Sequence, residues 1–479
     1  MAARSRGWCS VADCYNSPRL SSEYYECGLP FTFDAISRCS YGCLYCFAGP
    51  IKDSSRVPHG EDDQDYGGLP DLSFINIPRF RRLFQGAPED LSKDQKAHRQ
   101  AFVDQHLILH WGGLADAFDH YALGKYREKT LEVLRFLTDI KWPVLFSSKG
   151  AFWQDEELLE VFAANAGRWG FQSSIITYDP EIARKIEVSA PSPQDRIKTV
   201  EALSKRGIRT ILRFRPFCPG ISTGTWRELL TAAADAGAKA LSTEFLCIPF
   251  PDFEFSRRYF DRMGKAADFD FTAIYKAMSR HARGQPRLSR HWKKPYVYGM
   301  WEECEKRGVR FACSDPDYKE LTNASTCCGL SPEDLEGGQV TRGTFTEAIR
   351  IAFRRGSVRF ADISGDARVT LDPLQDDGVR GKDRLMRKLR QESVFDRVRG
   401  AWNIPTKSAM GVYNFFDRVL VPAAVDSNND LVYFFDYKRG LYETRTELEK
   451  FGVAASGLEE FGRQMAGALP GGAELPKGK

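Results

Sequence analysis

Short apolar runs alternate along the chain with longer segments in which apolar residues recur at every third or fourth position. The longer segments predict helices, among them 125–137 and 194–206. Strands that alternate with helices in this way are typical of a parallel sheet built from strand-helix-strand units. The short runs predict strands at 31–36, 106–111, 143–148, 171–177, 210–215 and 240–248.

These strands predict an α/β fold, a partial (β/α)6 TIM-type barrel, with the active site at the carboxyl ends of the strands. Beyond about residue 250 the alternation weakens, and the last part of the chain predicts a smaller C-terminal α+β extension. A chain of 479 residues is too long for one ordinary core. We therefore expect an N-terminal entry segment at 1–30, the barrel at 31–250, a basic and cysteine-containing extension at 251–335, and an accessory domain at 336–479.

The composition is that of a globular protein, with 42% hydrophobic, 13% aromatic and 28% charged residues. We expect a cytoplasmic protein without a membrane partner, because there is no apolar run of membrane-spanning length and the first residues lack the apolar core of a signal peptide. In that compartment the 12 cysteines favour metal ligation over disulfides. The net charge of +4 is too small to indicate a nucleic-acid partner by itself. Affinity for phosphate depends on local basic patches rather than on the net charge.

Three cysteines, Cys39, Cys43 and Cys46, follow the first predicted strand closely. A structural zinc site closes with four protein ligands and a disulfide consumes two thiols, so three thiols leave an open coordination position. An open position favours catalysis over structure. The alternatives are a zinc knuckle with a fourth ligand from elsewhere, or three unrelated buried cysteines.

The spacing Cys-x3-Cys-x2-Cys, with the aromatic Tyr45 before the last cysteine, resembles the radical S-adenosylmethionine (SAM) superfamily. The resemblance implies that Cys39, Cys43 and Cys46 hold three irons of a [4Fe-4S] cluster, and that SAM chelates the fourth iron. One electron from the cluster then cleaves SAM, and the resulting 5'-deoxyadenosyl radical abstracts hydrogen from the substrate. Tyr45 would belong to the cofactor site, and a protein such as a flavodoxin or ferredoxin would supply the electron.

Further segments resemble the spore photoproduct lyase-like, or DNA repair photolyase-like, branch of this superfamily. The residues that this resemblance assigns to the cofactor site are Gly112 and Gly113 after the second strand, Lys149, Ser174, Glu187 and Arg196. Read without the resemblance, the glycines form a plain turn, and the last two residues form an ion pair beside a helix start. The sequence departs from the branch in having no cysteine after the second strand, where spore photoproduct lyase proper carries its hydrogen donor. Return of hydrogen to the substrate would then fall to Cys218, Cys247 or Tyr178.

A later group of cysteines offers a possible second metal site. Cys304, Cys313, Cys327 and Cys328 could hold an auxiliary iron-sulfur cluster or zinc. The alternative is that these thiols are buried or redox-active without a metal.

Two basic segments bear on the substrate. Residues 280–296 interleave Arg and Lys with aromatic side chains, which suits phosphate contact and base stacking, and residues 380–390 form a second basic run. They indicate a nucleic-acid substrate, for repair or modification of a base, although charge runs are also common on solvated helix faces. The alternatives are radical SAM modification of a peptide, protein or small metabolite, as a lyase or a transferase, and a non-catalytic iron-sulfur protein.

Overall fold

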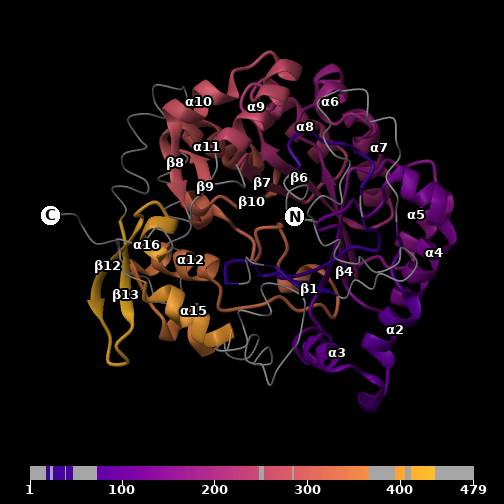
Figure 1. The fold of residues 1–479 in the computed structure, drawn as a ribbon, viewed down its shortest axis with the longest axis horizontal. Coiled ribbons are helices and arrows are strands. Elements are labelled where there is room, and N and C mark those ends of the chain that lie inside the picture. The colour runs from indigo at the N-terminus through magenta and orange to yellow at the C-terminus, as the bar shows by residue number, and fades with distance from the viewer. Residues whose placement is uncertain are drawn as a thin grey trace, which may run out of the picture.

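The computed structural model describes residues 18–21, 25–37, 39–46, 73–247, 253–282, 285–365, 394–404 and 411–436. Its largest element is one eight-stranded sheet, which runs through the middle of the molecule (Figure 1). In spatial order the strands are β1 (Arg19–Leu20), β2 (Phe31–Phe33), β3 (Leu109–Trp111), β4 (Val144–Ser148), β5 (Trp169–Ser174), β6 (Arg209–Phe217), β7 (Ala240–Phe245) and β10 (Arg310–Cys313).

All neighbours from β2 to β10 pair in parallel, and β1 adds an antiparallel edge. Within the described residues β1 and β10 do not pair with each other, so the sheet is a partial barrel rather than a closed one. The six predicted strands are confirmed as β2 to β7. The sequence did not predict β10, which carries the sheet across the expected boundary at residue 250; the domain boundaries stay a prediction.

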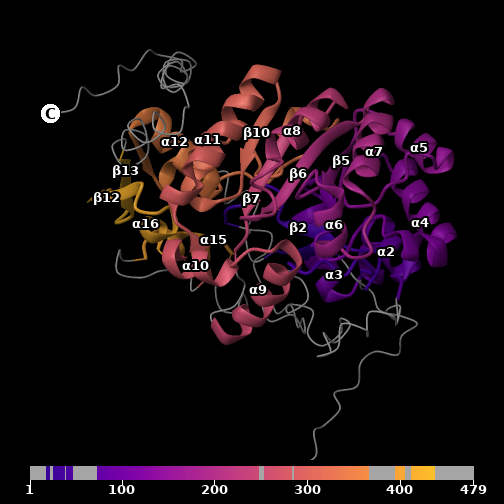
Figure 2. The same cartoon turned by 90° about the horizontal axis from the view of Figure 1, so that it is seen from above.

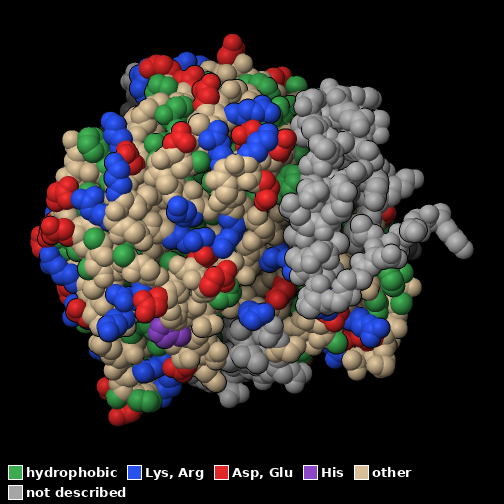
Figure 3. Space-filling view, turned by 180° about the vertical axis from the view of Figure 1, so that it is seen from behind, with side chains coloured by type: hydrophobic (Ala, Val, Ile, Leu, Met, Phe, Trp, Pro, Cys, Tyr) green, Lys and Arg blue, Asp and Glu red, His purple; other side chains and the backbone are tan. Residues whose placement is uncertain are grey.

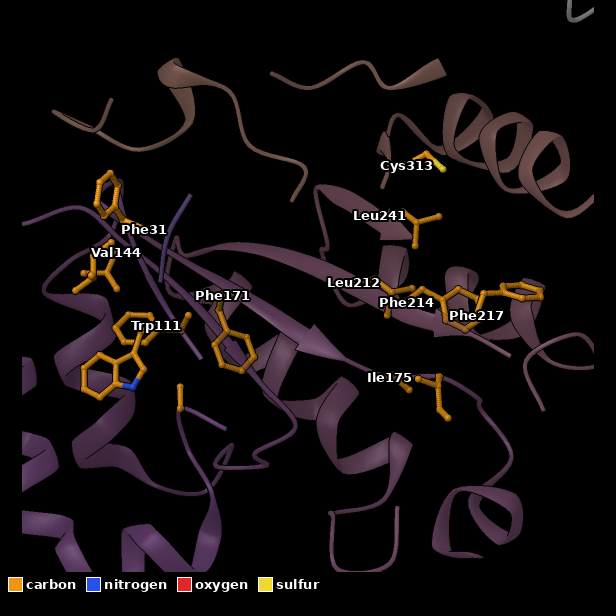
Figure 4. Packing of buried hydrophobic residues seen from close by; sticks show 14 of the residues in the cluster. Phe31, Trp111, Val144, Phe171, Ile175, Leu212, Phe214, Phe217, Leu241 and Cys313 are labelled. Carbon is orange, nitrogen blue, oxygen red and sulfur yellow. The ribbon is translucent and has the colours of Figure 1, made fainter. Parts of the chain in front are cut away.

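Helices cover one face of this sheet (Figures 1 and 2). Side chains such as Phe171, Leu212 and Leu241 point into this layer, where they belong to the large hydrophobic cluster (Figure 4). Both predicted helices are confirmed, as α4 and α7. The helices up to β10 are α2 (Ile77–Gln85), α3 (Lys93–His98), α4 (His120–Asp139), α5 (Glu156–Ala163), α6 (Pro180–Ile186), α7 (Pro193–Lys205), α8 (Trp226–Asp235), α9 (Phe253–Ala267), α10 (Phe271–Met278) and α11 (Arg290–Arg307).

The opposite face of the sheet, here called the inner face, is apolar at the amino ends of the strands and polar toward their carboxyl ends. Alternate residues of a strand share a face. At the amino ends, Leu145, Ile211 and Ala240 pack with Leu330 and Leu335 in a second, smaller hydrophobic cluster. The chain around residues 326–340 therefore covers the inner face at the amino ends of the strands.

Polar side chains of the inner face fix this filling segment by hydrogen bonds. Gln172 donates to the Cys328 carbonyl at 2.8 Å, and Ser242 donates to the Cys327 carbonyl at 2.8 Å. Arg215 also donates to the Cys327 carbonyl. Buried peptide groups need such partners, because an unpaired one costs about 1–3 kcal/mol.

The C-terminal region combines helices with a small antiparallel sheet, as predicted. Its strands lie in the order β11-β13-β12, and Phe345 and Tyr433 belong to the same hydrophobic cluster as the barrel. The remaining elements are β8 (Ser279–Ala282), β9 (Gln285–Leu288), α12 (Phe345–Arg355), β11 (Ser357–Arg359), α15 (Val394–Trp402), α16 (Val412–Phe415), β12 (Leu420–Val425) and β13 (Leu431–Phe435). No helix in the described part of the chain is long and apolar enough to cross a membrane.

Where the structure describes the side chains of the basic segment 280–296, the cations Arg290, Lys293 and Lys294 are buried, which argues against these three as a phosphate-binding surface. Lys293 is fully buried and contacts both Asp315, at 2.8 Å, and Asp317. Arg290 is also buried and pairs with Glu320 at 2.7 Å. Buried charges need such partners, so these cations stabilise the fold. The second basic segment, 380–390, lies outside the described residues.

We expect Lys293→Ala to lower the free energy of unfolding by about 3–5 kcal/mol, because it leaves two carboxylates buried without their cation. The exposed Lys306, which pairs with Glu302 at 3.0 Å on α11, provides the control. Lys306→Ala should change the same quantity by less than about 1 kcal/mol. Urea denaturation measures both variants, and equal stabilities would show that Lys293 has no structural role.

Candidate functional site

The three motif cysteines lie on a loop of residues 39–46, the cysteine loop, which follows β2 at the carboxyl end of the sheet. The loop pairs with the end of α6 rather than with a strand of the sheet. The Leu44 amide donates to the Ile186 carbonyl at 2.9 Å, and Cys43 forms a bridge with Glu187. The backbone of the loop is thus anchored on the chain that connects α6 to α7.

A second anchor comes from Asp119, the N-cap of α4. One oxygen of its carboxylate accepts from both the amide and the hydroxyl of Ser40, each at 2.7 Å, and from the Cys39 thiol at 3.5 Å. The other oxygen accepts from the Ala122 amide at 2.9 Å, which caps the helix. One carboxylate therefore fixes both the start of α4 and the first cysteine of the motif.

The predicted residues Tyr45, Ser174, Glu187 and Arg196 form one connected group. The Tyr45 hydroxyl donates to Glu187, and the Glu187 carboxylate pairs with the Arg196 guanidinium at 2.6 Å, where both side chains are fully buried. Arg196 also donates to the Ser174 carbonyl at 2.9 Å and to the Pro191 carbonyl. The group links the cysteine loop to the end of β5.

Lys149, at the end of β4, lies on the other side of the tyrosine. Its ammonium is 5.6 Å from the centre of the Tyr45 ring, and its backbone amide donates to Asp116 at 2.6 Å. Burial alone would lower the pKa of Lys149, but the charges of Cys43, Glu187 and Asp116 outweigh burial and raise the pKa. A cation at this point favours the thiolate form of Cys43.

The Gly112-Gly113 turn has a steric cause within the chain itself. Gly112 has φ +108°, and a Cβ there would lie 2.2 Å from the Ser147 carbonyl oxygen. The turn is held by Asp34, whose carboxylate accepts from the amides of Leu114 and Ala115 at 3.0 and 2.9 Å. Position 112 therefore requires glycine because the backbone of β4 lies so close to it. Contact of this turn with the cofactor stays a prediction.

The motif cysteines are accessible to different extents. Cys39 and Cys46 are half-buried, and Cys43 is 8% exposed. Burial raises the pKa of Cys43 to about 12, against the opposing charges of Lys149 and Arg196.

No group of three or more His, Cys, Asp or Glu side chains in the described part of the chain is arranged to hold a single metal ion. A [4Fe-4S] cluster makes a different demand, because each thiolate binds its own iron. The three thiols on this one anchored loop match the three cysteine ligands that such a cluster needs. The cation of Lys149 beside them favours the thiolate form.

Three residues were predicted to return hydrogen, and their surroundings differ. Cys247 is half-buried and forms a bridge with Arg287. Cys218 is fully buried within the large hydrophobic cluster, and burial raises the pKa of its thiol well above the usual value. Tyr178 is half-buried, and its backbone bonds to Thr225 and Gln194. A role for any of the three residues in the reaction stays a prediction.

The four later cysteines divide between the two hydrophobic clusters. Cys304 and Cys313 belong to the large cluster, and Cys327 and Cys328 to the smaller one on the inner face. There they meet Cys27, whose sulfur is 4.0 Å from that of Cys327. Hydrogen bonds from Cys27 and Cys328 lower the pKa of the Cys327 thiol. The structure therefore does not gather the predicted ligand set, and it brings in Cys27 instead.

Sequence reasoning missed the carboxylates that hold the site, Asp34, Asp116 and Asp119. Asp119 precedes an amphipathic helix, so its role as an N-cap could have been found in the sequence. Its bond to Ser40 could not, because 79 positions separate the two residues.

The chain matches no family model and no curated protein sequence. Solved structures of spore photoproduct lyase resemble this chain. A cysteine-to-serine mutant of that enzyme is 12% identical with a TM-score of 0.43, over 65% of this chain and 87% of the other. A double mutant with bound AdoMet and dinucleoside spore photoproduct gives 12% and 0.41, over 61% and 80%.

A third solved structure is Streptococcus suis SuiB bound to the precursor peptide SuiA. It is 12% identical with a TM-score of 0.31, over 61% of this chain and 60% of the other. Similarities of this size do not carry an activity, so the assignment of a function rests on the residues of this chain.

His110 lies on the inner face, in the same polar layer as Gln172. Its ring nitrogen Nε2 is 2.7 Å from the Ser147 hydroxyl, which in turn donates to Gln172 at 2.7 Å. Burial, followed by the charges of Arg213 and Arg215, lowers the pKa of His110 to about 3. The imidazole is therefore neutral in the folded protein at any pH near neutrality.

We expect this histidine to make the protein sensitive to acid. The unfolded chain binds a proton at His110 below pH of about 6.5 and the folded chain only near pH 3, so stability falls between these values by up to about 1.4 kcal/mol per pH unit. His110→Gln should remove this part of the slope, whereas the exposed His120→Gln should keep it. Urea denaturation between pH 7 and pH 4 measures the slopes, and identical slopes for all three proteins would contradict the assignment.

Proposed function

We propose that this protein is a radical SAM enzyme, which binds a [4Fe-4S] cluster at Cys39, Cys43 and Cys46. The observation that carries the proposal is the anchoring of the cysteine loop at the carboxyl end of a parallel sheet, where the sites of such folds lie. When bound, the cluster and SAM supply one-electron cleavage of the cofactor to a 5'-deoxyadenosyl radical, which abstracts hydrogen.

The protein's own residues supply positioning and charge. Glu187 and Arg196 hold the tyrosine of the motif and the end of β5 in fixed relation, since each is hydrogen-bonded as well as paired. Lys149 places a cation beside Cys43. The same ammonium group is able to pair with the carboxylate of a ligand bound at this end of the sheet. We propose that Lys149 and Ser174 bind SAM. The half-buried Cys39 and Cys46 leave an approach for a reductant protein such as a flavodoxin or ferredoxin.

Anaerobic reconstitution with iron and sulfide, followed by dithionite and SAM, tests the chemistry directly. We expect the wild-type protein to bind iron and release 5'-deoxyadenosine, and a Cys39→Ala, Cys43→Ala, Cys46→Ala triple variant to release none, because the cluster loses all three protein ligands. Iron per chain and 5'-deoxyadenosine are measured, and circular dichroism of the variant shows that the fold is intact.

Iron that the triple variant retains would report a second site. If the fully loaded wild-type protein cleaves no SAM, even with DNA or RNA present, the chain is a non-catalytic iron-sulfur protein.

For the substrate we propose a nucleic acid, modified or repaired at a base. The support differs from what the sequence indicated, because Arg290 and Lys293 are committed to buried carboxylates. On the face shown in Figure 3, Lys and Arg side chains mostly alternate with Asp and Glu, and one small group of cations lies near the centre. Support for a phosphate-bearing substrate comes instead from arginines on the inner face, which lie beside the proposed cofactor site.

Retention on immobilised single-stranded DNA and RNA at increasing salt tests this substrate class. We expect binding to weaken steeply, because each phosphate contact releases counterions and contributes about 0.7 to the logarithmic slope on single strands. Retention that is absent, or unaffected by salt, would favour a peptide or a small metabolite as the substrate.

A further inference from the structure

Two arginines stand next to each other on the inner face of β6. Arg213 and Arg215 are separated by one residue, so their side chains leave the strand on the same side as Ile211, which packs in the inner cluster. Both are half-buried and thus within reach of solvent. Their position on β6 is nearer to the carboxyl end than that apolar cluster.

Neither guanidinium has an ion-pair partner within 4.0 Å among the described residues. The Arg213 guanidinium donates to the Ser174 hydroxyl at 3.4 Å, and Arg215 donates to the carbonyl of Cys327. The Nε atom of each arginine is buried without any hydrogen-bond partner. Each guanidinium therefore keeps unused donors.

Few carboxylates act on this pair. The carboxylate whose charge acts on both arginines, Glu244 on β7, contacts a third arginine, Arg287, at 3.5 Å. The neighbouring His110 is neutral, as shown above. Glu244 is therefore engaged by Arg287, and among the described residues no carboxylate forms an ion pair with Arg213 or Arg215.

Like charges held together at a half-buried position cost free energy unless an anion offsets them. Burial, and then the charge of Arg215, lower the pKa of Arg213. The pKa of Arg215 is raised, because the charges of Cys327, Cys328 and Glu244 outweigh its burial. A half-buried cationic pair with free donors is stabilised by an oxyanion, since a guanidinium binds carboxylate or phosphate oxygens with two parallel hydrogen bonds.

The pair also lies beside the proposed cofactor site. Ser174 accepts from Arg213 through its hydroxyl and from Arg196 through its carbonyl. Arg196 leads through Glu187 to Tyr45 on the cysteine loop. A ligand at the arginine pair would therefore be a near neighbour of the reacting groups.

We propose that Arg213 and Arg215 form an oxyanion site that binds a phosphate group of the substrate. The assignment to a substrate rests on the proposed function, whereas the binding of an oxyanion does not. The SAM carboxylate is a second source of the same chemistry, and the experiment separates the two.

The first arm measures binding of radiolabelled inorganic phosphate to the full-length protein by equilibrium dialysis. We expect saturable binding to the wild-type protein, and binding weaker by about tenfold or more in Arg213→Gln and Arg215→Gln, because each charge-assisted bond contributes that much. Arg135→Gln is the matched control, since Arg135 is exposed on α4 and pairs with Glu157 at 2.8 Å. This control should bind phosphate as the wild-type protein does.

Arg213→Lys covers the case in which a glutamine variant fails to fold. A lysine keeps the charge without the planar fork, so we expect weakened but measurable binding. The proposal is overturned if the wild-type protein binds no phosphate, or if the arginine variants that fold bind it as tightly as Arg135→Gln does.

The second arm repeats the titration on the reconstituted protein with saturating SAM. Phosphate binding that persists supports a substrate site, whereas displacement by SAM together with weaker SAM binding in Arg213→Gln assigns the pair to the cofactor and overturns the proposal. Phosphate should also bind to the triple cysteine variant. If SAM cleavage fails while the arginine dependence of phosphate binding holds, the proposed function falls and the oxyanion site stands.

Discussion

The candidate site depends on the buried ion pair between Glu187 and Arg196. Taking both charges out of water is costly, and the cost is offset only where further hydrogen bonds satisfy the remaining donors and acceptors. Here Tyr45 donates to the carboxylate, and the carbonyls of Ser174 and Pro191 accept from the guanidinium. Because each of these groups belongs to a different segment, the requirement to satisfy two charges fixes the cysteine loop, the end of β5 and the start of α7 relative to one another.

The inner face shows the opposite arrangement of charge. Arg196, on α7, pairs with Glu187 and donates to two carbonyls, whereas Arg213 and Arg215, on β6, keep donors without partners. A fold that supplies carboxylates for Arg290 and Lys293 is able to satisfy buried cations. Within the described part of the chain, no carboxylate lies at ion-pair distance from the β6 arginines, which is therefore a local feature of the site and points to a ligand that brings its own negative charge.

The sequence was sufficient for the elements and the motif, and insufficient for the contacts between them. Periodicity identified six of the seven parallel strands, but β10 is only four residues long and follows a helix rich in charge. Spacing identified the three thiols of the cysteine loop. Asp34 and Asp119, which hold this loop and its neighbouring turn, make their bonds across about 80 positions of sequence. Such contacts depend on the parallel order of strands, which local patterns do not encode.

The basic segment shows why a run of charge does not define a surface. Its cations lie on and before α11, which packs against β10 and against the turn of residues 316–321. That turn contains Asp317 and Glu320, and Asp315 precedes it, so the complementary charges lie about 20 to 30 residues further along the chain. A run of cations followed by a run of carboxylates thus becomes one buried network. Cations that are paired in this way are not available to bind phosphate. Arginines without an ion-pair partner among the described residues are available, and Arg213 and Arg215 on β6 meet that condition.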